Sequence, residues 1–119
     1  MMFNEFGLIM VVVSDMAKSV AFYRDVLGLT LQFDSPDWSQ FQVGHVQLGL
    51  HLEGPGLPVN SASGINFGFY VKSVEEALEA LKAKGASPAR ISEEEFGTLA
   101  IIADPDGYGI QICQLKYGH

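Results

Sequence analysis

The sequence predicts an α+β fold of two tandem βαβββ modules that form a curled mixed sheet around a cleft. The first observation is a repeat: an apolar strand, a helix N-cap, an amphipathic helix and a terminating glycine occur twice, about 58 residues apart. The second is that three strand-like segments follow each helix. The third is size, because 119 residues with 48% apolar side chains suffice for one core but hardly for two. We therefore expect a single domain over residues 1–119, with modules near 6–53 and 64–117.

The first module begins with an almost entirely apolar segment, Leu8 to Val13, which is typical of a strand buried on both faces. Asp15 is a favourable N-cap for the helix that follows. Apolar residues then recur at helical spacing on one face: Met16, Val20, Tyr23 and Leu27. Gly28 supplies the left-handed conformation that commonly ends a helix. The pattern predicts one helix packed on a sheet.

Three strand segments complete this module, at residues 29–34, 38–43 and 45–52. The last alternates strictly, with Val46, Leu48, Leu50 and Leu52 on one face and His45, Gln47, Gly49 and His51 on the other. Because the apolar face turns to the core, the opposite face is polar and carries two histidines. We expect His45, which follows Gly44 in a hairpin turn, to be exposed.

A loop at residues 53–64, rich in Gly, Pro, Ser and Asn, separates the modules. Residues 65–71 then alternate as a strand. Ser73 and Glu76 form a capping box, in which each side chain satisfies an N–H group of the first helical turn. We expect Gly85 to end this helix.

The rest of the second module contains three more strands, near residues 89–92, 99–103 and 108–115. Between the last two, Asp104 to Gly107 is a strong turn sequence, because proline fixes φ and glycine permits the left-handed conformation. The acidic run Glu93 to Glu95 is interpreted as a solvated loop.

The chain is acidic, with fourteen Asp and Glu against seven Lys and Arg and a net charge of -7. This charge repels phosphate backbones and anionic lipids, so we expect neither nucleic acid nor a membrane as a partner. The longest apolar run, residues 8–13, is far shorter than the roughly 20 residues of a membrane span. A single cysteine, Cys113, cannot form an intrachain disulfide. Together these features predict a cytoplasmic protein.

Five short motifs occur in a characteristic order: Val13-Ser-Asp-Met16 leading to Ser19, Phe22-Tyr23-Arg24, Val26-Leu-Gly-Leu29, Phe96-Gly97 and Asp104-Pro-Asp-Gly-Tyr108. In this order, and with the βαβββ repeat, they resemble the vicinal oxygen chelate superfamily. That superfamily includes glyoxalases, extradiol dioxygenases and bleomycin resistance proteins. The resemblance covers essentially the whole chain, and it implies assembly as a homodimer and a cleft formed by two modules, which belong either to one chain or to the two chains of the dimer.

In metal-using members of that superfamily, the ligands come from the first and fourth strands of each module. The resemblance places these positions at Leu8, Gly49, Asn66 and Gln111. Leu8 and Gly49 have no side-chain donor atom, and the two amides are weaker ligands than carboxylates. An amide at Gln111 also cannot act as a general base. We expect no metal or other cofactor; the alternative is a divalent ion held by His51 and Gln111.

The resemblance also implies which strand faces line the cleft. We expect ligand-binding side chains in pairs along these strands, with two apolar walls: His51 and Gln47, Asn66 and Tyr70, Gln111 and Cys113, and the walls Trp38 and Met10. The indole of Trp38 could stack on a planar ligand. Core packing is the interpretation for Phe33 and Phe41. Few charges lie on these faces, so we expect a neutral or weakly polar ligand.

The function that these observations favour is binding of a small organic molecule in a cleft, without a catalytic metal. One alternative is a metal-dependent glyoxalase-like lyase or isomerase, and a further one is a dimerisation module with a vestigial cleft. An extradiol dioxygenase is disfavoured by the missing ligands. Whether the chain is an enzyme stays open, and we assign no catalytic residue. His51 is a candidate general base, although histidines on a polar strand face more often form hydrogen bonds.

Overall fold

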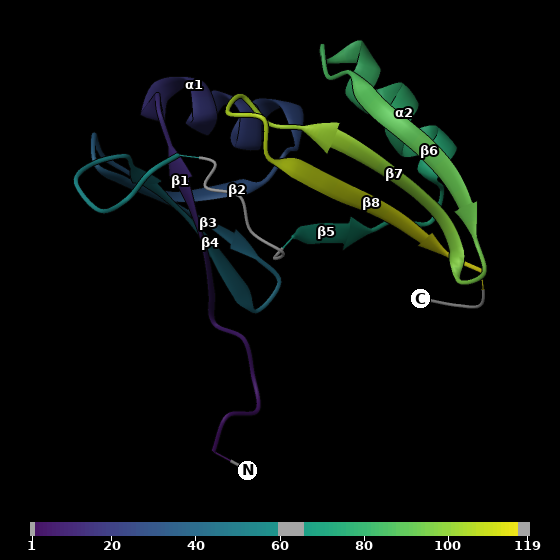
Figure 1. Cartoon of the computed structure of the whole chain (residues 1–119), viewed down its shortest axis with the longest axis horizontal. Helices are drawn as coiled ribbons and strands as arrows, with labels where there is room; N and C mark the ends of the chain where they lie inside the picture. Colours follow the sequence, from purple (N-terminus) through teal and green to yellow (C-terminus); the bar gives the residue numbers. More distant parts are fainter. Residues whose placement is uncertain (1, 60–65, 117–119) are drawn as a thin grey trace. The chain divides into compact units, whose positions relative to one another are not determined.

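The computed structural model describes residues 2–59 and 66–116, apart from the side chains of residues 88 and 89. The chain divides into two compact units, Met1–Ser61 and Ala62–His119 (Figure 1). Each unit holds one four-stranded mixed sheet and its own helical segment. The two units are therefore the two repeats of the sequence.

Unit 1 contains β1 (Leu8–Val13), α1 (Met16–Ala21), η1 (Phe22–Val26), β2 (Thr30–Asp34), β3 (Trp38–Val43) and β4 (Val46–Leu52). Its strand order is β1-β4-β3-β2. The first strand pairs with the fourth in parallel, and the other pairs are antiparallel. The helical segment thus connects β1 to the far edge of the sheet.

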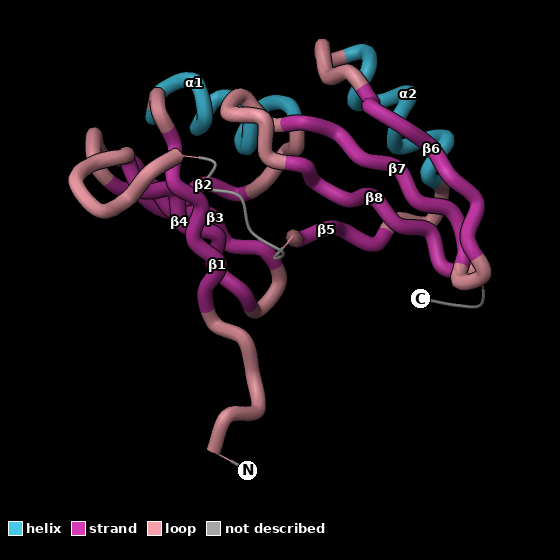
Figure 2. The backbone as a smooth tube through the Cα atoms, in the orientation of Figure 1, coloured by secondary structure: helices cyan, strands magenta, loops and turns pink. Residues whose placement is uncertain are grey.

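Unit 2 contains β5 (Phe67–Tyr70), α2 (Val74–Ala83), β6 (Pro88–Glu94), β7 (Gly97–Ala103) and β8 (Gly109–Leu115), with strands and helices distinguished in Figure 2. Its order is β5-β8-β7-β6, again with the first and last strands parallel. The topology repeats that of unit 1. The predicted α+β fold of two βαβββ modules is confirmed.

Both predicted helix N-caps are confirmed. The carboxylate of Asp15 accepts from the backbone N–H of Lys18 at 3.0 Å, and the hydroxyl of Ser73 accepts from that of Glu76 at 3.1 Å. Each such cap stabilises its helix by about 1 kcal/mol. The two caps therefore fix the residues at which the helices begin, after β1 in unit 1 and after β5 in unit 2.

The helical segment of unit 1 differs from the single α-helix that the sequence predicts. After Ala21 it widens into the π-helix η1, where the N–H of Leu27 donates to the carbonyl of Phe22 at 3.0 Å. The segment then stops at Gly28, whose φ is 74°. A π-turn adds one residue per turn, and the apolar spacing that indicates an α-helix does not reveal that addition.

The core of each unit lies between its sheet and its helix. In unit 1 the buried side chains come from alternate strand positions and from the helical segment: Val11, Val13, Phe41, Leu48, Leu50, Met16, Val20 and Tyr23. In unit 2 they are Val74, Leu78, Ala86, Ala100, Ile102, Ile110 and Ile112. The burial of Leu48 and Leu50 agrees with the core face predicted for β4.

The prediction that β1 is buried on both faces is wrong. Leu8 and Met10 are 51% and 44% exposed, whereas Val11 and Val13 are buried. The strand alternates, because α1 covers only one face of the sheet. On the face that α1 does not cover, β1 therefore exposes the apolar side chains of Leu8 and Met10.

Two further expectations need correction. Phe41 is buried as predicted, but Phe33 is 55% exposed because the β2–β3 register shifts between Leu31 and Phe33 and turns Phe33 away from the core. Glu93 and Glu94 belong to β6 rather than to a loop, and Glu93 accepts from the hydroxyl of Thr98.

Some expectations fall at the edges of the described chain. Residue 65, at the start of the 65–71 strand, and all of residues 60–64 lie outside the described residues, as does His119. His45 is exposed in the turn between β3 and β4, as expected. No helix in the part of the chain that the structure describes is long and apolar enough to cross a membrane.

Candidate functional site

The face of the unit 1 sheet opposite α1 carries most of the site residues predicted for that module. Strand pairing aligns Met10 with Gly49, and Trp38 with His51. The side chains that share this face, called here the open face, are Leu8, Met10, Val12, Thr30, Gln32, Phe33, Trp38, Gln40, Gln42, Gln47, Gly49 and His51. None of these described residues is Asp, Glu, Lys or Arg.

Trp38 lies over Gly49 at the centre of the open face. A Cβ atom added to Gly49 would lie 2.5 Å from Cζ2 of the indole, closer than real side chains approach. Only glycine leaves room for the ring here. The position that the sequence resemblance assigns to a metal ligand is thus covered by an aromatic ring.

His51 lies beside the same indole, with ring centroids 6.1 Å apart and an edge-on arrangement. Its Nδ1 is 2.8 Å from the carbonyl oxygen of Leu52. Because a carbonyl only accepts, the neutral ring holds its proton on Nδ1 and presents Nε2 as an acceptor. His51 can therefore receive a hydrogen bond from a ligand.

Next to Trp38, three amide side chains form a continuous row of hydrogen bonds. The indole Nε1 donates to Gln40 Oε1 at 3.3 Å, and Gln40 Nε2 donates to Gln32 Oε1 at 3.0 Å. Gln32 Nε2 then donates to Gln42 Oε1 at 2.9 Å, and Gln42 Nε2 donates to the carbonyl of Gly44 at 2.6 Å. We call Gln32, Gln40 and Gln42 the glutamine row.

Unit 2 provides a second set of candidate residues around a small pocket. The pocket has a volume of about 220 Å³ and is lined by Gly68, Phe69, Tyr70, Gln111 and Cys113. Strand pairing aligns Gly68 with Gln111 and Tyr70 with Cys113. A Cβ on Gly68 would lie 2.6 Å from Cβ of Gln111, so the glycine lets β5 approach β8 closely.

The structure gathers the predicted residues into two groups, one in each unit. Unit 1 brings together Met10, Trp38, Gln47 and His51 on the open face, and unit 2 brings together Tyr70, Gln111 and Cys113 at the pocket. Asn66 is exposed just before β5 and is not among the residues that line the pocket.

The donor atoms at the four metal positions do not match a divalent ion. Leu8 has none, the Gly49 position is covered by Trp38, and Asn66 and Gln111 offer only neutral amides. Among the described residues, no group of three or more His, Cys, Asp and Glu is arranged to hold a metal. No reaction step can be derived through a metal here.

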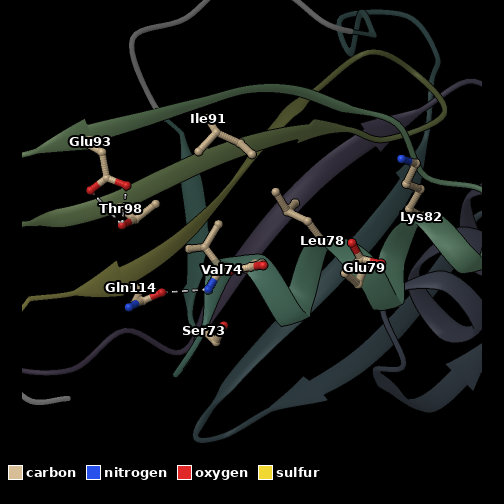
Figure 3. A pocket seen from close by; sticks show the side chains of 10 residues that line it. Ser73, Val74, Leu78, Glu79, Lys82, Ile91, Glu93, Thr98 and Gln114 are labelled. Carbon is tan, nitrogen blue, oxygen red and sulfur yellow. Dashed lines mark hydrogen bonds between the residues drawn. The ribbon is translucent and has the colours of Figure 1, made fainter.

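A separate groove runs along the helix side of unit 2 (Figure 3), and none of the predicted site residues is among those that line it. Its volume is about 600 Å³, and it lies between α2 and strands β6 to β8. Leu78 and Ile91 face each other across it, and Gln114 accepts from the backbone N–H of Val74 at 2.9 Å. Its remaining lining residues are mostly charged: Glu75, Glu79, Lys82 and Glu93, with Ser73 and Thr98.

Sequence reasoning missed the glutamine row and the closeness of Gly68 to Gln111. A signal for the row was present, because Gln40 and Gln42 flank the buried Phe41 in strict alternation. The inclusion of Gln32 depends on the β2 register shift, which the alternation does not predict. The approach of β5 to β8 depends on strand pairing between segments far apart in the sequence.

Comparison with a protein-family model identifies residues 5–112 as matching the Glyoxalase/Bleomycin resistance protein/Dioxygenase superfamily. Among curated proteins, the chain is similar to a lactoylglutathione lyase of Salmonella typhimurium, with 29% identity and 87% of each chain covered.

Two solved structures from Streptomyces sp. CB03234 are also similar. One is TnmS3, an antibiotic binding protein, with 26% identity, a TM-score of 0.84, and coverage of 98% of this chain and 99% of that one. The other is a glyoxalase/bleomycin resistance protein with 27% identity, a TM-score of 0.75, and coverage of 92% and 100%.

Proposed function

The chain belongs to the Glyoxalase/Bleomycin resistance protein/Dioxygenase superfamily, and from this premise we propose that it binds a small, uncharged organic molecule without a catalytic metal. The binding surfaces are the open face of unit 1 and the pocket of unit 2. The main supporting observation is that the Trp38 indole packs against Gly49, at the position that the resemblance assigns to a metal ligand.

The chemistry of the open face supports a neutral ligand. Its twelve residues offer amides, one hydroxyl, one imidazole, one indole and apolar side chains, but no Asp, Glu, Lys or Arg. Binding sites for organic molecules combine apolar walls with a few placed polar groups. Trp38 and Met10 supply apolar surface, and His51 and Gln47 supply hydrogen-bonding groups.

One of the comparisons supports a binding function. The structural relative TnmS3 is described as an antibiotic binding protein. The runner-up function, a metal-dependent lyase, is supported by the similarity to the lactoylglutathione lyase of Salmonella typhimurium. Two observations count against it in this chain: the donor atoms at the metal positions, and the lack of a carboxylate at Gln111.

We also propose that the chain assembles as a homodimer. Leu8 and Met10 expose large apolar side chains on the open face, and Met2, Phe3 and Phe6 are more than 80% exposed ahead of β1. Exposed apolar surface of this extent is typical of an association surface. A second copy of the chain would remove it from water.

Trp38 is the chain's only tryptophan, so its fluorescence reports binding at the open face. The test uses chelator-treated protein and two uncharged planar probes, acridone and 1,8-naphthalimide. We expect saturable quenching of Trp38 fluorescence and a higher melting temperature, both unchanged by added chelator. Saturable binding that appears only after Zn²⁺ or Ni²⁺ is added, or lactoylglutathione lyase activity of the metal-loaded protein, would favour the lyase.

Substitutions locate the site. His51→Ala and Gln111→Ala should each weaken probe binding by roughly 1 to 3 kcal/mol, because a buried polar group of the complex loses its partner. Glu94→Ala, an exposed position at the end of β6, is the control and should leave binding unchanged. If both site variants bind as tightly as the wild type while folding normally, the binding site lies elsewhere.

A further inference from the structure

The glutamine row has a fixed direction, because both of its ends are chemically unambiguous. The indole N–H of Trp38 can only donate, so the atom of Gln40 that faces it must be the oxygen. The carbonyl of Gly44 can only accept, so the atom of Gln42 that faces it must be the nitrogen. Gln32 connects the two and is consistent with both ends. The amide orientations therefore follow from hydrogen bonding and are not arbitrary.

Each amide of the row retains hydrogen-bonding capacity. A glutamine side chain has two N–H donors and two acceptor lone pairs. Within the part of the chain that the structure describes, every member of the row uses one of each with its neighbours. One donor and one acceptor remain on each of the three amides. The row is thus a strip of alternating donors and acceptors held in position in advance.

The row lies beside an aromatic surface and away from charge. Trp38, half-buried over Gly49, is the first member of the hydrogen-bond chain. No Asp, Glu, Lys or Arg of the described strands shares the face. A carboxylate ligand would therefore lose its hydration without meeting a cation, whereas a neutral carbonyl or N–H group would find a matched partner.

We propose that the glutamine row is the specificity-determining strip of the open face. It selects flat, uncharged ligands that carry carbonyl and N–H groups along one edge, such as cyclic imides and amides, and it disfavours carboxylates. This inference rests on the proposed function, since it names the ligand class of the same site. The three residues Gln32, Gln40 and Gln42 act as one unit, because each orients the next.

The test compares three probes that share one naphthalene ring system. 1,8-Naphthalimide presents carbonyl, N–H and carbonyl along one edge, its N-methyl derivative lacks the N–H, and the naphthalene-1,8-dicarboxylate dianion carries two charges. Quenching of Trp38 fluorescence gives the affinity of each. We expect the imide to bind about tenfold or more tightly than the dianion, with the N-methyl derivative between them.

Substitutions in the glutamine row test whether these side chains recognise the ligand or have only a structural role in the sheet. Gln32→Leu, at an exposed position of β2, should weaken imide binding about tenfold and leave dianion binding unchanged, so that the preference nearly disappears. Gln42→Leu should act in the same direction. The control is Ala17→Leu, which adds the same side chain at an exposed position of α1 and should leave the preference within twofold of the wild type. A purely structural role for the row would not change the preference.

The outcomes distinguish this inference from the proposed function. If the imide and the dianion bind with equal affinity, the glutamine row does not select the ligand. The same conclusion follows if Gln32→Leu and Gln42→Leu keep the wild-type preference for the imide. In either case, binding at Trp38 is still supported. If acridone and all three naphthalene probes fail to quench saturably, the proposed function is overturned, and this inference with it.

Discussion

Trp38 occupies the space that a side chain at residue 49 would fill, and the two positions lie on neighbouring strands, β3 and β4. The pairing is not direct, because Trp38 aligns with His51 and the indole reaches diagonally to the glycine. Diagonal neighbours across a sheet lie within reach of aromatic side chains. The indole therefore covers the position that the sequence resemblance assigns to a metal ligand.

Gly49→Ala should displace the Trp38 indole from its packing position against residue 49. An added methyl group clashes with the six-membered ring, so either the strand shifts or Trp38 rotates toward water. We expect unfolding free energy to fall by about 1 to 3 kcal/mol and Trp38 emission to move to longer wavelength. Gly54→Ala, where nothing lies within 4 Å of the added Cβ, is the matched control and should change neither. If the emission wavelength of Trp38 is unchanged in Gly49→Ala, the indole does not pack against Gly49 in solution.

Divalent metal ions should not stabilise the protein. Leu8 and Gly49 provide no donor atoms, and Gln111 provides only a neutral amide. A specific site would raise stability by about 2.7 kcal/mol at a metal concentration one hundred times the dissociation constant. We expect melting curves in Zn²⁺, Ni²⁺ and Fe²⁺ to superimpose on those in chelator. A stoichiometric metal that survives dialysis would contradict the metal-free proposal and make His51 and Gln111 its first candidate ligands.

The architecture was predictable because its signals are local. Asp15 and Ser73 are caps that act on the next three residues, and the alternation of Leu48 and Leu50 with Gln47 and Gly49 fixes the faces of β4. A repeat of such signals is enough to specify the order of elements, and the family motifs confirm it. These features need no knowledge of which strands pair.

The details of the site were less accessible because they depend on pairing. The register shift in β2 exposes Phe33 and adds Gln32 to the row, and neither outcome follows from the alternating pattern. The clash that excludes a side chain at residue 49 comes from a residue eleven positions earlier in the chain. Sequence identified Trp38 as a candidate ligand contact, but not the glycine that makes room for it.

Gly68 should be as intolerant of a side chain as Gly49, for a different reason. Its added Cβ would lie 2.6 Å from both Cβ and the backbone oxygen of Gln111, and backbone cannot rotate away. Gly68→Ala should therefore lower the unfolding free energy of the protein by about 1 to 3 kcal/mol and weaken the binding of 1,8-naphthalimide if the unit 2 pocket contributes to the site. Chemical denaturation gives the first quantity. Gly7→Ala, with open space around the added Cβ, is the control, and equal stability of the two variants would refute the close approach.

The β1 edge of the open face should be covered by a second copy of the chain in solution. Leu8 and Met10 are about half exposed, although Val11 and Val13 of the same strand are buried. Such a surface favours association. We expect sedimentation velocity at micromolar concentration to show a dimer. Leu8→Glu should shift the distribution toward monomer, because dimerisation would bury a charge without a partner. Ala17→Glu, which adds the same charge at an exposed position of α1, should not. A wild-type monomer at that concentration would contradict the dimer and leave the apolar open face to be covered within one chain or by the ligand.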